Sequence, residues 1–596
     1  MIDIPDWILV VLFVLTIITA FWYNINKSKK HLDKESNAKC IINNKKYKKY
    51  TILDFLKQAS KDNPKKTALK IKTKNSWKSV SYLEYYDNVL NFAQSINYWL
   101  GPKVNVSILG FNSPGWFFAH MGCMLNGGIS VGLYPTSTSK ICEKIINDAN
   151  VELLVVEDDE QLKKFMDIDI SGIKLIIYYS PISKKMVDKF SVPVISMGNF
   201  MTKRVTTTLK PPHLDDIATL IYTSGTTGNQ KGTMITHKNI MSSVSQMLSL
   251  IDTKSGKNSI CGERFISYLP LNHIAAQMMD IYIPLVTLST VWFADKNALK
   301  STLGDTIKDA KPTIFIGVPR VWEKIVEQIE AGLENEGVGG SLVKLVSPWK
   351  IIEKIGFNKC KLAITSTAPI SENTIKYLEA IGLPLYNTYG MSETTGPISV
   401  SVPNASAVGS VGVPIMKVKI AKDNEILVKG DNLFVGYYKN KKATTESFTK
   451  DGWFKTGDLG KLDKGFLYVT GRKKEIIITA GGENISPIPI ENELHKYLSN
   501  YFEYIIVIGD KMKFLSVILN STKKLPKNIN EIVNNAITET NKKAQSNTHT
   551  IKKFLIIPKK FSVGNELTPT FKTKREFIQT KYAKQIQELY KQSSTK

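Results

Sequence analysis

Short apolar runs rich in β-branched residues alternate with helix-like stretches along most of this chain. Clear examples of such runs are residues 104–110, 129–134, 151–157 and 174–179, and the amphipathic stretch 140–149 lies between two of them. Apolar runs without alternating polar residues predict strands that are buried on both faces. Strands that alternate with helices predict parallel sheets covered on both sides by helices, so we expect an α/β protein.

The chain divides into a large body and a smaller C-terminal part. The strand pattern recurs at 313–320, 361–369 and 384–390, and a second set of runs follows Arg472, at 475–482, 504–510 and 514–520. We therefore predict a large N-terminal domain over residues 51–472, built of α/β subdomains, and a small α+β domain over residues 473–596. A chain of 596 residues with 43% apolar content can form both cores.

Residues 1–30 are predicted to form one transmembrane anchor. The stretch from Trp7 to Asn26 carries no charge and has aromatic residues at both ends, and a helix of about 20 residues spans one hydrocarbon core. Acidic residues precede it and lysines follow it, so the positive-inside rule places the rest of the chain in the cytosol. The alternatives are a cleaved signal peptide, which would want a basic start, and an interfacial or buried helix. Residues 31–50 are predicted to be a basic linker.

The formal net charge of +26 does not indicate nucleic-acid binding. Among 79 basic residues the arginines are only Arg204, Arg264, Arg320, Arg472 and Arg575, whereas a nucleic-acid face would be expected to use the planar arginine fork. The lysines predict a solvated surface, part of which would favour an anionic membrane. Five widely spaced cysteines predict neither a disulfide framework nor a zinc site. No obligate protein partner is evident.

The strongest local signal is the segment YTSGTTGNQKG, residues 222–232, which follows the apolar run IATLI. Glycines let a backbone approach phosphate oxygens closely, while the hydroxyls and Lys231 supply donors and charge. A flexible turn of small residues is the alternative. A Walker loop is excluded, because that motif requires Ser or Thr after its lysine and Gly232 stands there.

This segment resembles the phosphate loop of the adenylate-forming superfamily, which includes acyl-CoA synthetases, luciferases and peptide-synthetase adenylation domains. The other motifs of that family follow in order between about residues 50 and 580, with Gln230 as a departure from the usual proline. The resemblance implies an adenylate-forming body, a mobile C-terminal domain, and the use of ATP, Mg²⁺ and CoA. In the loop it implies nucleotide contacts by Thr223, Ser224, Gly225, Thr226, Thr227, Gly228 and Lys231.

Two further motifs carry the expected acyl and adenine contacts. LPLNHIAAQ contains His273, which by resemblance lies beside the acyl carboxylate and the phosphates, although a lone histidine is more often structural. STAPIS matches the segment that lines the adenine pocket, and NTYGMSETTGP adds a tyrosine expected to stack on adenine. The nucleotide contacts implied by these two segments are Ser366, Thr367, Ala368, Pro369, Tyr389, Gly390 and Ser392.

Carboxylates supply the implied metal and ribose contacts. By resemblance Glu393 is the Mg²⁺ ligand, which fits the preference of Mg²⁺ for few, hard protein oxygens. GWFKTGDLG places Asp458 where the family holds the ribose, and one carboxylate can accept both vicinal hydroxyls. An Asp-stabilised turn is the alternative there. Arg472, at the domain boundary, is implied to contact ribose or phosphate.

The C-terminal part supplies the remaining residues. ELTPTFKTKRE resembles the motif with the catalytic lysine of adenylation, and its spacing favours Lys572, with Lys574 as the nearby alternative. A positioned ammonium is suited to stabilise charge on the carboxylate, the α-phosphate and the departing pyrophosphate. The family's hinge falls on Lys474, and Gly481 and Gly482 lie on a hairpin near the pantetheine path of CoA.

Several strings are narrower than the superfamily. LPLNHIAAQ, GVPRVWEKI, YGMSETTGP and ITAGGENISPIPIE are similar to bubblegum-type long-chain acyl-CoA synthetases. That resemblance implies that a long or very long fatty acid is activated with MgATP to acyl-AMP and then transferred to CoA. The alternatives are a fatty acyl-AMP ligase or a medium-chain synthetase and, more remotely, a non-catalytic membrane lipid-binding protein. The expected location is an intracellular membrane such as the endoplasmic reticulum.

Overall fold

The computed structural model describes residues 49–591, apart from 75, 207, 224–229, 256–259, 336–347, 367–369, 481, 523, 545, 563 and 569–571. The predicted anchor, and the predicted linker up to residue 48, lie outside the described residues. Within the described part, no helix is both long and apolar enough to cross a bilayer.

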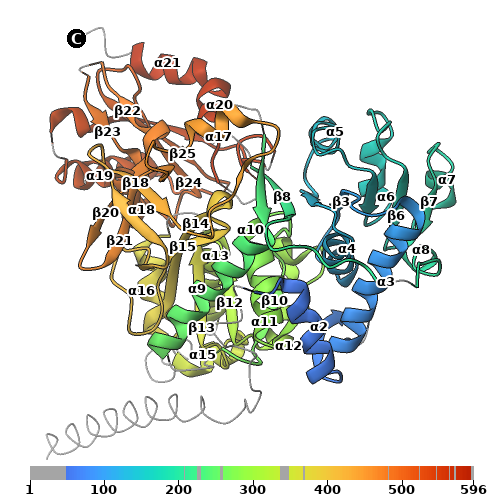
Figure 1. The fold of residues 1–596 in the computed structure, drawn as a ribbon. Helices are drawn as coiled ribbons and strands as arrows, with labels where there is room; N and C mark the ends of the chain where they lie inside the picture. Colours follow the sequence, from blue (N-terminus) through green and yellow to red (C-terminus); the bar gives the residue numbers. More distant parts are fainter. Residues whose placement is uncertain are drawn as a thin grey trace, which may run out of the picture.

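The largest sheet is the predicted α/β layer (Figure 1). Its strands, in spatial order, are β19 (Gly436–Tyr437), β9 (Lys231–Thr236), β8 (Ile217–Thr223), β4 (Ser130–Leu133), β3 (Val106–Leu109), β5 (Leu153–Val156), β6 (Leu175–Tyr178) and β7 (Val194–Ser196). The pairs from β8 to β7 are parallel, and β9 pairs antiparallel with both of its neighbours. The four apolar runs named first in the sequence are β3 to β6, so that prediction is confirmed.

Both faces of this sheet are covered, as predicted for strands without polar alternation. In β5, Leu153 and Val155 belong to one apolar cluster, whereas Leu154 and Val156 belong to another. Helices α3 (Tyr82–Leu100) and α4 (Pro114–Leu125) contribute to the first cluster, and α5 (Ser139–Asp148) contributes to the second. The stretch 140–149 is therefore a helix on one face of a buried sheet.

Three smaller sheets complete the large body (Figure 1). The first contains β12 (Ile314–Gly317), β13 (Leu362–Ser366), β14 (Leu385–Met391), β15 (Gly396–Val400) and β16 (Val413–Pro414). The second contains β10 (Arg264–Ser267), β11 (Thr290–Phe293), β1 (Thr67–Lys72) and β2 (Trp77–Ser81). The third is antiparallel and contains β17 (Lys417–Ile420), β18 (Glu425–Lys429), β20 (Phe454–Asp463) and β21 (Phe466–Arg472).

The other helices of the body pack around these sheets. Local signals set several of their starts: α2 begins after Thr51, whose side chain and that of Asp54 form a capping box. The remaining helical elements are α2 (Ile52–Asp62), α6 (Asp159–Leu162), η1 (Lys163–Phe165), α7 (Lys184–Val187), α8 (Met197–Phe200), α9 (His237–Ser255), α10 (Ile274–Ala276), the π-helix η2 (Gln277–Tyr282), α11 (Ile283–Val286), η3 (Ala298–Thr302), α12 (Leu303–Ala310), α13 (Pro319–Asn335), α15 (Pro348–Lys354), α16 (Glu372–Ala380), η4 (Ser392–Thr394) and α17 (Lys441–Glu446).

The C-terminal part has its own sheet and its own apolar clusters. It contains η5 (Lys473–Glu475), β22 (Ile477–Ile478), β23 (Asn484–Ile485), α18 (Pro487–Leu498), β24 (Tyr504–Ile508), β25 (Leu515–Asn520), α19 (Ile529–Asn541), η6 (Asn547–His549), β26 (Ile551–Ile557), α20 (Arg575–Lys581) and α21 (Ala583–Lys591). The strand predicted at 475–482 is wrong in extent, because a 3-10 turn occupies its start and only two of its residues, Ile477 and Ile478, pair as a strand.

In the large body, Cys261 is disulfide-bonded, which the sequence did not predict.

The C-terminal part docks on the body through polar contacts at α16 and α18. The Lys496 ammonium lies 3.4 Å from the Glu372 carboxylate, and the Asn373 side-chain amide donates to the Lys496 carbonyl at 3.2 Å. In Figure 1 this part lies at the top of the view, and α18 contacts β21 of the body.

Candidate active site

Two strand ends close the predicted phosphate loop. β8 ends at Thr223 and β9 begins at Lys231, and the two residues are paired across the ladder. Residues 224–228, which complete the predicted set, lie outside the described residues. The Lys231 ammonium lies 4.8 Å from the centre of the Tyr437 ring, a cation–π contact with the neighbouring strand β19.

Glu393 is joined to the same tyrosine. Its carbonyl accepts from the Phe434 amide at 2.8 Å, and its Oε1 accepts from the Tyr437 hydroxyl at 2.9 Å. Burial raises the pKa of the Glu393 carboxyl, against the smaller, lowering effect of that hydroxyl. A cation at this carboxylate would offset the cost of burying its charge. The donor set is therefore compatible with Mg²⁺, which takes hard oxygens and few protein ligands.

Asp458 connects two other predicted residues, Arg472 and Tyr389. It lies opposite Arg472 in the β20–β21 ladder, and its Oδ1 accepts from the Arg472 Nε at 2.9 Å. Its Oδ2 accepts from the Tyr389 hydroxyl at 2.7 Å. Asp458 is 4% exposed, whereas the Arg472 side chain is 47% exposed. A buried carboxylate thus holds a phenol and a guanidinium at the edge of the site.

The other predicted adenine residues lie on or beside β14, which carries Tyr389. Ser366 ends β13 and its hydroxyl donates to the Thr388 carbonyl of β14 at 3.0 Å, while Ser392 is buried at the start of η4. A Cβ on Gly390 would lie 2.1 Å from the Gly396 carbonyl oxygen, so the approach of β14 to β15 requires glycine there. Residues 367–369, also predicted, lie outside the described residues.

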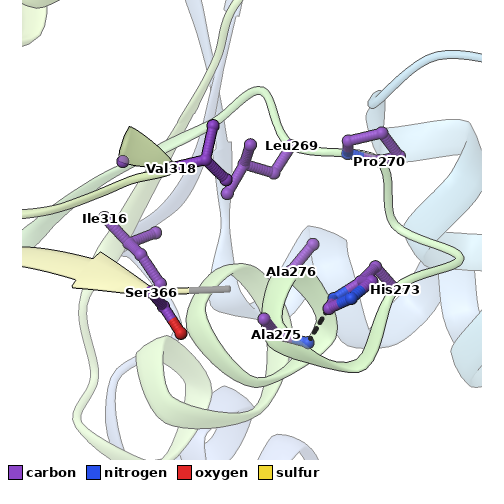
Figure 2. A pocket seen from close by; sticks show the side chains of 9 residues that line it. Leu269, Pro270, His273, Ala275, Ala276, Ile316, Val318 and Ser366 are labelled. Atoms are coloured by element: carbon purple, nitrogen blue, oxygen red, sulfur yellow. Dashed lines mark hydrogen bonds between the residues drawn. The ribbon is translucent and has the colours of Figure 1, made fainter. Parts of the chain in front are cut away.

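His273 stands at the start of α10, where its Nδ1 accepts from the Ala275 amide at 3.2 Å (Figure 2). The pKa of its imidazole is lowered to about 4, first by burial and then by the positive charge of Lys572. The ring is therefore neutral near pH 7. Because Nδ1 accepts a hydrogen bond, we assign the single ring proton to Nε2. His273 thus offers a hydrogen-bond donor without adding a cation.

A narrow apolar pocket begins at His273 (Figure 2). Its other lining residues are Leu269, Pro270, Ala275, Ala276, Ile316, Gly317, Val318 and Ser366. The pocket holds about 10 Å³ of water-accessible space, room for roughly one water molecule. A long alkyl chain would therefore enter it only with movement of lining side chains. Ser366, predicted for adenine, also borders this pocket.

Lys572 reaches this region from the C-terminal part. The Thr568 amide donates to the Lys572 carbonyl at 2.8 Å, which closes the turn that carries the lysine. Burial lowers the pKa of the Lys572 ammonium to about 8, and Arg472 lowers it further, against the opposing charges of Asp458 and Glu475. Lys572 also acts on the pKa of His273. The Lys572 ammonium is therefore close enough to both His273 and the Asp458–Arg472 pair to interact with them electrostatically.

The alternative lysine points elsewhere. The Lys574 ammonium donates to the Gly564 carbonyl at 2.6 Å, within its own loop. Its charge interacts with Glu566 and with none of the predicted site residues described above. The sequence left open whether Lys572 or Lys574 is the lysine of the site, and these contacts favour Lys572.

The predicted hinge residue lies between two residues that form ion pairs with different parts of the protein. Lys474 is exposed in η5. On one side Lys473 pairs with Asp423 at 2.6 Å and Glu425 at 2.9 Å, both in the large body. On the other side Glu475 pairs with Arg575 of α20 at 3.3 Å. Each neighbour is therefore fixed to a different part of the protein.

The hairpin predicted near the pantetheine path is described at one of its two glycines. Gly482 has a φ of +81°, and its amide donates to the Thr479 carbonyl at 2.9 Å, so it turns the chain between β22 and β23. Gly481 lies outside the described residues.

The fold and the site together define the class of adenylate-forming enzymes. A family model described as AMP-binding enzyme matches residues 56–438, and a second, described as AMP-binding enzyme C-terminal domain, matches residues 474–594. Among solved structures, the adenylation domain of a carboxylate reductase from Mycobacterium chelonae is 18% identical with a TM-score of 0.75, covering 91% of each chain. The o-succinylbenzoate CoA synthetase of Bacillus subtilis, solved with an acyl-adenylate intermediate, is 22% identical with a TM-score of 0.67, covering 88% of this chain and 97% of that one.

Curated relatives are more similar in sequence. The long-chain-fatty-acid–CoA ligase ACSBG2 of Homo sapiens is 34% identical over 91% of this chain and 92% of its own length. ACSBG1 of Rattus norvegicus is 32% identical, covering 91% of this chain and 86% of that protein. The chain therefore belongs to the AMP-binding enzymes, among the bubblegum-type long-chain-fatty-acid–CoA ligases.

The structure adds residues that the motifs did not name. Tyr437 links Lys231 with Glu393, and Glu475 adds a negative charge near Lys572. Tyr437 carries no sequence signal, since it lies in an unremarkable LFVGYYKN string some 40 residues beyond Glu393. Glu475 lies next to the predicted hinge residue Lys474, but its position near Lys572 was not predicted. Their roles follow from strand pairing and domain docking, which local sequence does not encode.

Proposed function

We propose that this chain is a long-chain fatty acyl-CoA synthetase that works in two half-reactions. A carboxylate oxygen of the fatty acid attacks the α-phosphorus of MgATP, and pyrophosphate departs, which gives acyl-AMP. The sulfur of CoA then attacks the acyl carbon, and AMP departs, which gives the thioester. The observation that carries the proposal is that Lys572 of the small part and neutral His273 of the body face one site bordered by the Asp458–Arg472 pair.

Each reacting group has a partner of suitable charge. Lys572 would balance charge on the α-phosphate and the departing pyrophosphate, and the Nε2–H of His273 would donate to a carboxylate or phosphate oxygen. Asp458 would accept the ribose hydroxyls, Arg472 would contact ribose or phosphate, and the Tyr389 ring would stack on adenine. The fatty carboxylate is already a nucleophile, so position and charge balance are the main contributions of these residues.

The triphosphate would lie between the phosphate loop and Glu393. Lys231 and the loop amides would hold phosphate oxygens, and Glu393, oriented by the Tyr437 hydroxyl, would hold Mg²⁺. When bound, Mg²⁺ supplies neutralisation of triphosphate charge. Ser366, Gly390 and Ser392 would border the nucleotide through their backbones and hydroxyls.

The second half-reaction requires a different face of the small domain. Rotation about Lys474 would keep Lys473 with the body and Glu475 with α20, because each has its own ion pairs. Such a rotation would withdraw Lys572 and bring the Gly481–Gly482 hairpin to the CoA path. Such a hinge lies next to the domain boundary that the sequence predicts between residues 472 and 473.

We propose further that residues 7–26 anchor the chain in an intracellular membrane such as the endoplasmic reticulum, with residues beyond 31 in the cytosol. The uncharged length, the aromatic ends and the flanking charges support this arrangement. Alkaline carbonate extraction tests it: full-length chain should stay with the membrane, and chain lacking residues 1–30 should be released. Release of both would contradict an anchor.

The activity test measures AMP release by the full-length chain with fatty acids of increasing length. Long-chain acids should give a maximum that depends on both ATP and CoA. Pyrophosphate release without a thioester would favour a fatty acyl-AMP ligase, and a maximum at shorter chains would favour a medium-chain synthetase. No turnover with any acid, together with ATP binding, would favour a non-catalytic lipid-binding protein.

A further inference from the structure

A chain of buried polar side chains runs from the central sheet to the turn that carries His273. Its members are Ser130 of β4, His120 of α4, and Tyr282 and Gln277 of η2, and each is 0% exposed. Ser130 Oγ lies 2.7 Å from His120 Nδ1, and His120 Nε2 lies 2.9 Å from the Tyr282 hydroxyl. The Tyr282 hydroxyl donates to Gln277 Oε1 at 2.9 Å, and Gln277 Nε2 donates to the Leu271 carbonyl at 2.9 Å.

The donor and the acceptor of each hydrogen bond from Ser130 to Leu271, called the relay below, can be assigned. The Leu271 carbonyl only accepts, so the Gln277 amide must present its nitrogen there and its oxygen to Tyr282. The single Tyr282 proton is thereby used on Gln277, so His120 Nε2 must donate to the tyrosine oxygen. Burial lowers the pKa of His120 to about 3, so the ring is neutral and its Nδ1 accepts from Ser130. All four hydrogen bonds then point toward Leu271, an arrangement in which each bond strengthens the next.

The π-helix makes this relay possible. Gln277 and Tyr282 are five residues apart, and η2 shows the corresponding backbone bond five residues long, from the Ile283 amide to the Met278 carbonyl. An α-helix hydrogen-bonds residues four apart and would turn these two side chains away from each other. Short π-helical turns are frequent at functional sites, because they realign side chains in this way.

The relay ends on both sides of His273. The Gln277 side chain holds the Leu271 carbonyl two residues before the histidine, and the Gln277 backbone amide donates to the His273 carbonyl at 3.1 Å. The His273 amide donates to the Pro270 carbonyl at 3.0 Å, which closes the turn between these two anchor points. Gln277 therefore fixes the backbone of residues 271–273, from which the His273 imidazole projects into the pocket of Figure 2.

We propose that Gln277, Tyr282 and His120 are positioning residues that hold the His273 imidazole, with its Nε2–H, in the orientation used for acyl adenylation. The reaction in this proposal is the one given by the proposed function, so that part rests on it. The choice of the three residues rests only on the hydrogen bonds of the relay. If the network only stabilised the core, breaking it would lower the free energy of unfolding and leave the chemistry of His273 unchanged. The two readings therefore differ in what a change at Tyr282 does to His273.

The first test needs no turnover. In the full-length chain, Tyr282→Phe removes one hydroxyl from the relay. Tyr82→Phe is the matched control, because Tyr82 is similarly buried and its hydroxyl donates to the backbone carbonyls of Pro284 at 3.3 Å and Ser289 at 2.7 Å, and to none of the relay side chains. The rate of His273 modification by diethyl pyrocarbonate is read by mass spectrometry. It should rise severalfold in Tyr282→Phe and stay at the wild-type rate in Tyr82→Phe. An unchanged rate in both variants would overturn the proposal.

The second test is a double-mutant cycle on fatty-acid-dependent ATP–pyrophosphate exchange. Tyr282→Phe should lower kcat about tenfold, the loss that corresponds to a single buried hydrogen bond, with the KM for ATP unchanged. In a His273→Ala background the same change should cost less than about twofold, since coupled residues are not additive. Equal losses in both backgrounds would overturn the proposal. Ser130→Ala, at the far end of the relay, serves if Tyr282→Phe does not fold, and should show a smaller loss of the same pattern.

The two tests separate the two claims. If the wild-type chain shows no exchange with any fatty acid while His273 modification still responds to Tyr282→Phe, the proposed function fails and the relay stands. If exchange is normal and His273 modification does not respond, the relay fails and the proposed function stands.

Discussion

The proposed nucleotide end and the proposed acyl end of the site are built in opposite ways. At the nucleotide end charged side chains are paired with one another, as in Asp458 with Arg472. At the acyl end His273 is neutral and faces apolar residues, and the polar atoms behind it are satisfied inside a buried relay. Phosphate and ribose are recognised by charge and hydrogen bonds, whereas an alkyl chain is recognised by the removal of apolar surface from water. Each end therefore has the chemistry of its proposed substrate.

The largest effect should come from the residue that connects the two ends. Lys572→Ala should lower acyl-adenylate formation about 10²- to 10³-fold, the usual cost of removing one preorganised charge-stabilising group. Thioester formation from supplied acyl-AMP should be spared. Lys574→Ala is the matched control and should retain nearly full activity, because that ammonium is held by the Gly564 carbonyl. Equal losses in both half-reactions would remove the distinction on which the assignment depends.

A change confined to the nucleotide end should be smaller and should act on ATP. Asp458→Asn keeps the shape but loses the charge that pairs with Arg472, so the KM for ATP should rise about 10-fold, within the range for a charge-assisted hydrogen bond. The KM for the fatty acid should stay near the wild-type value. A larger change in the fatty-acid KM than in the ATP KM would mean that the two ends are not separate.

The pH profile of adenylation should fall at high pH because Lys572 loses its proton, and it should show no change from the titration of His273. The Lys572 pKa is lowered to about 8, so the charged form is lost as pH rises through that value. The kcat/KM for adenylation should then fall about tenfold per pH unit above pH 8, while thioester formation from acyl-AMP should lack this limb. His273, with a pKa of about 4, stays neutral between pH 5 and 8. A limb shared by both half-reactions would contradict this account.

The smallest effect should come from the tyrosine that the sequence did not reveal. Tyr437→Phe removes the hydrogen bond to Glu393 and keeps the ring under Lys231. Loss of that bond should raise the Glu393 pKa and weaken Mg²⁺ binding, so the Mg²⁺ concentration for half-maximal rate should rise about threefold. The control is Tyr438→Phe, the next residue in the chain. Equal effects of the two variants would place Tyr437 outside the metal site.

Sequence reasoning named more of the residues at the proposed nucleotide end than at the proposed acyl end. Motifs identified Asp458, Arg472, Glu393 and Lys572 separately because each depends on a short string, and the structure brings three of them into one charge cluster. His273 was found, but its tautomer and its neutral state depend on burial and on a lysine about 300 residues later in the chain. Gln277 ends the recognised string LPLNHIAAQ, but its role was not predicted, because that role depends on a π-helix that hydropathy patterns do not distinguish from an α-helix.

The fold was predictable for a different reason. The runs that form β3 to β6 are apolar on both faces, so their pattern predicts strands of a sheet that is covered on both sides. The hinge region was not predictable in the same way, because 475–482 has the composition of a strand and yet forms a 3-10 turn and a two-residue pairing. Lys473, just before this segment, pairs with Glu425 of the body, and Glu475 at its start pairs with Arg575 of α20, so tertiary contacts override the local preference.

The most direct test follows an oxygen atom from one end of the site to the other. A long-chain fatty acid labelled with ¹⁸O in its carboxylate is turned over with ATP, Mg²⁺ and CoA, and the AMP is analysed by mass spectrometry. Attack of the carboxylate on the α-phosphorus predicts one ¹⁸O atom in each AMP and none in pyrophosphate. Unlabelled AMP, or label in pyrophosphate, would contradict the joining of the two ends through an acyl-adenylate.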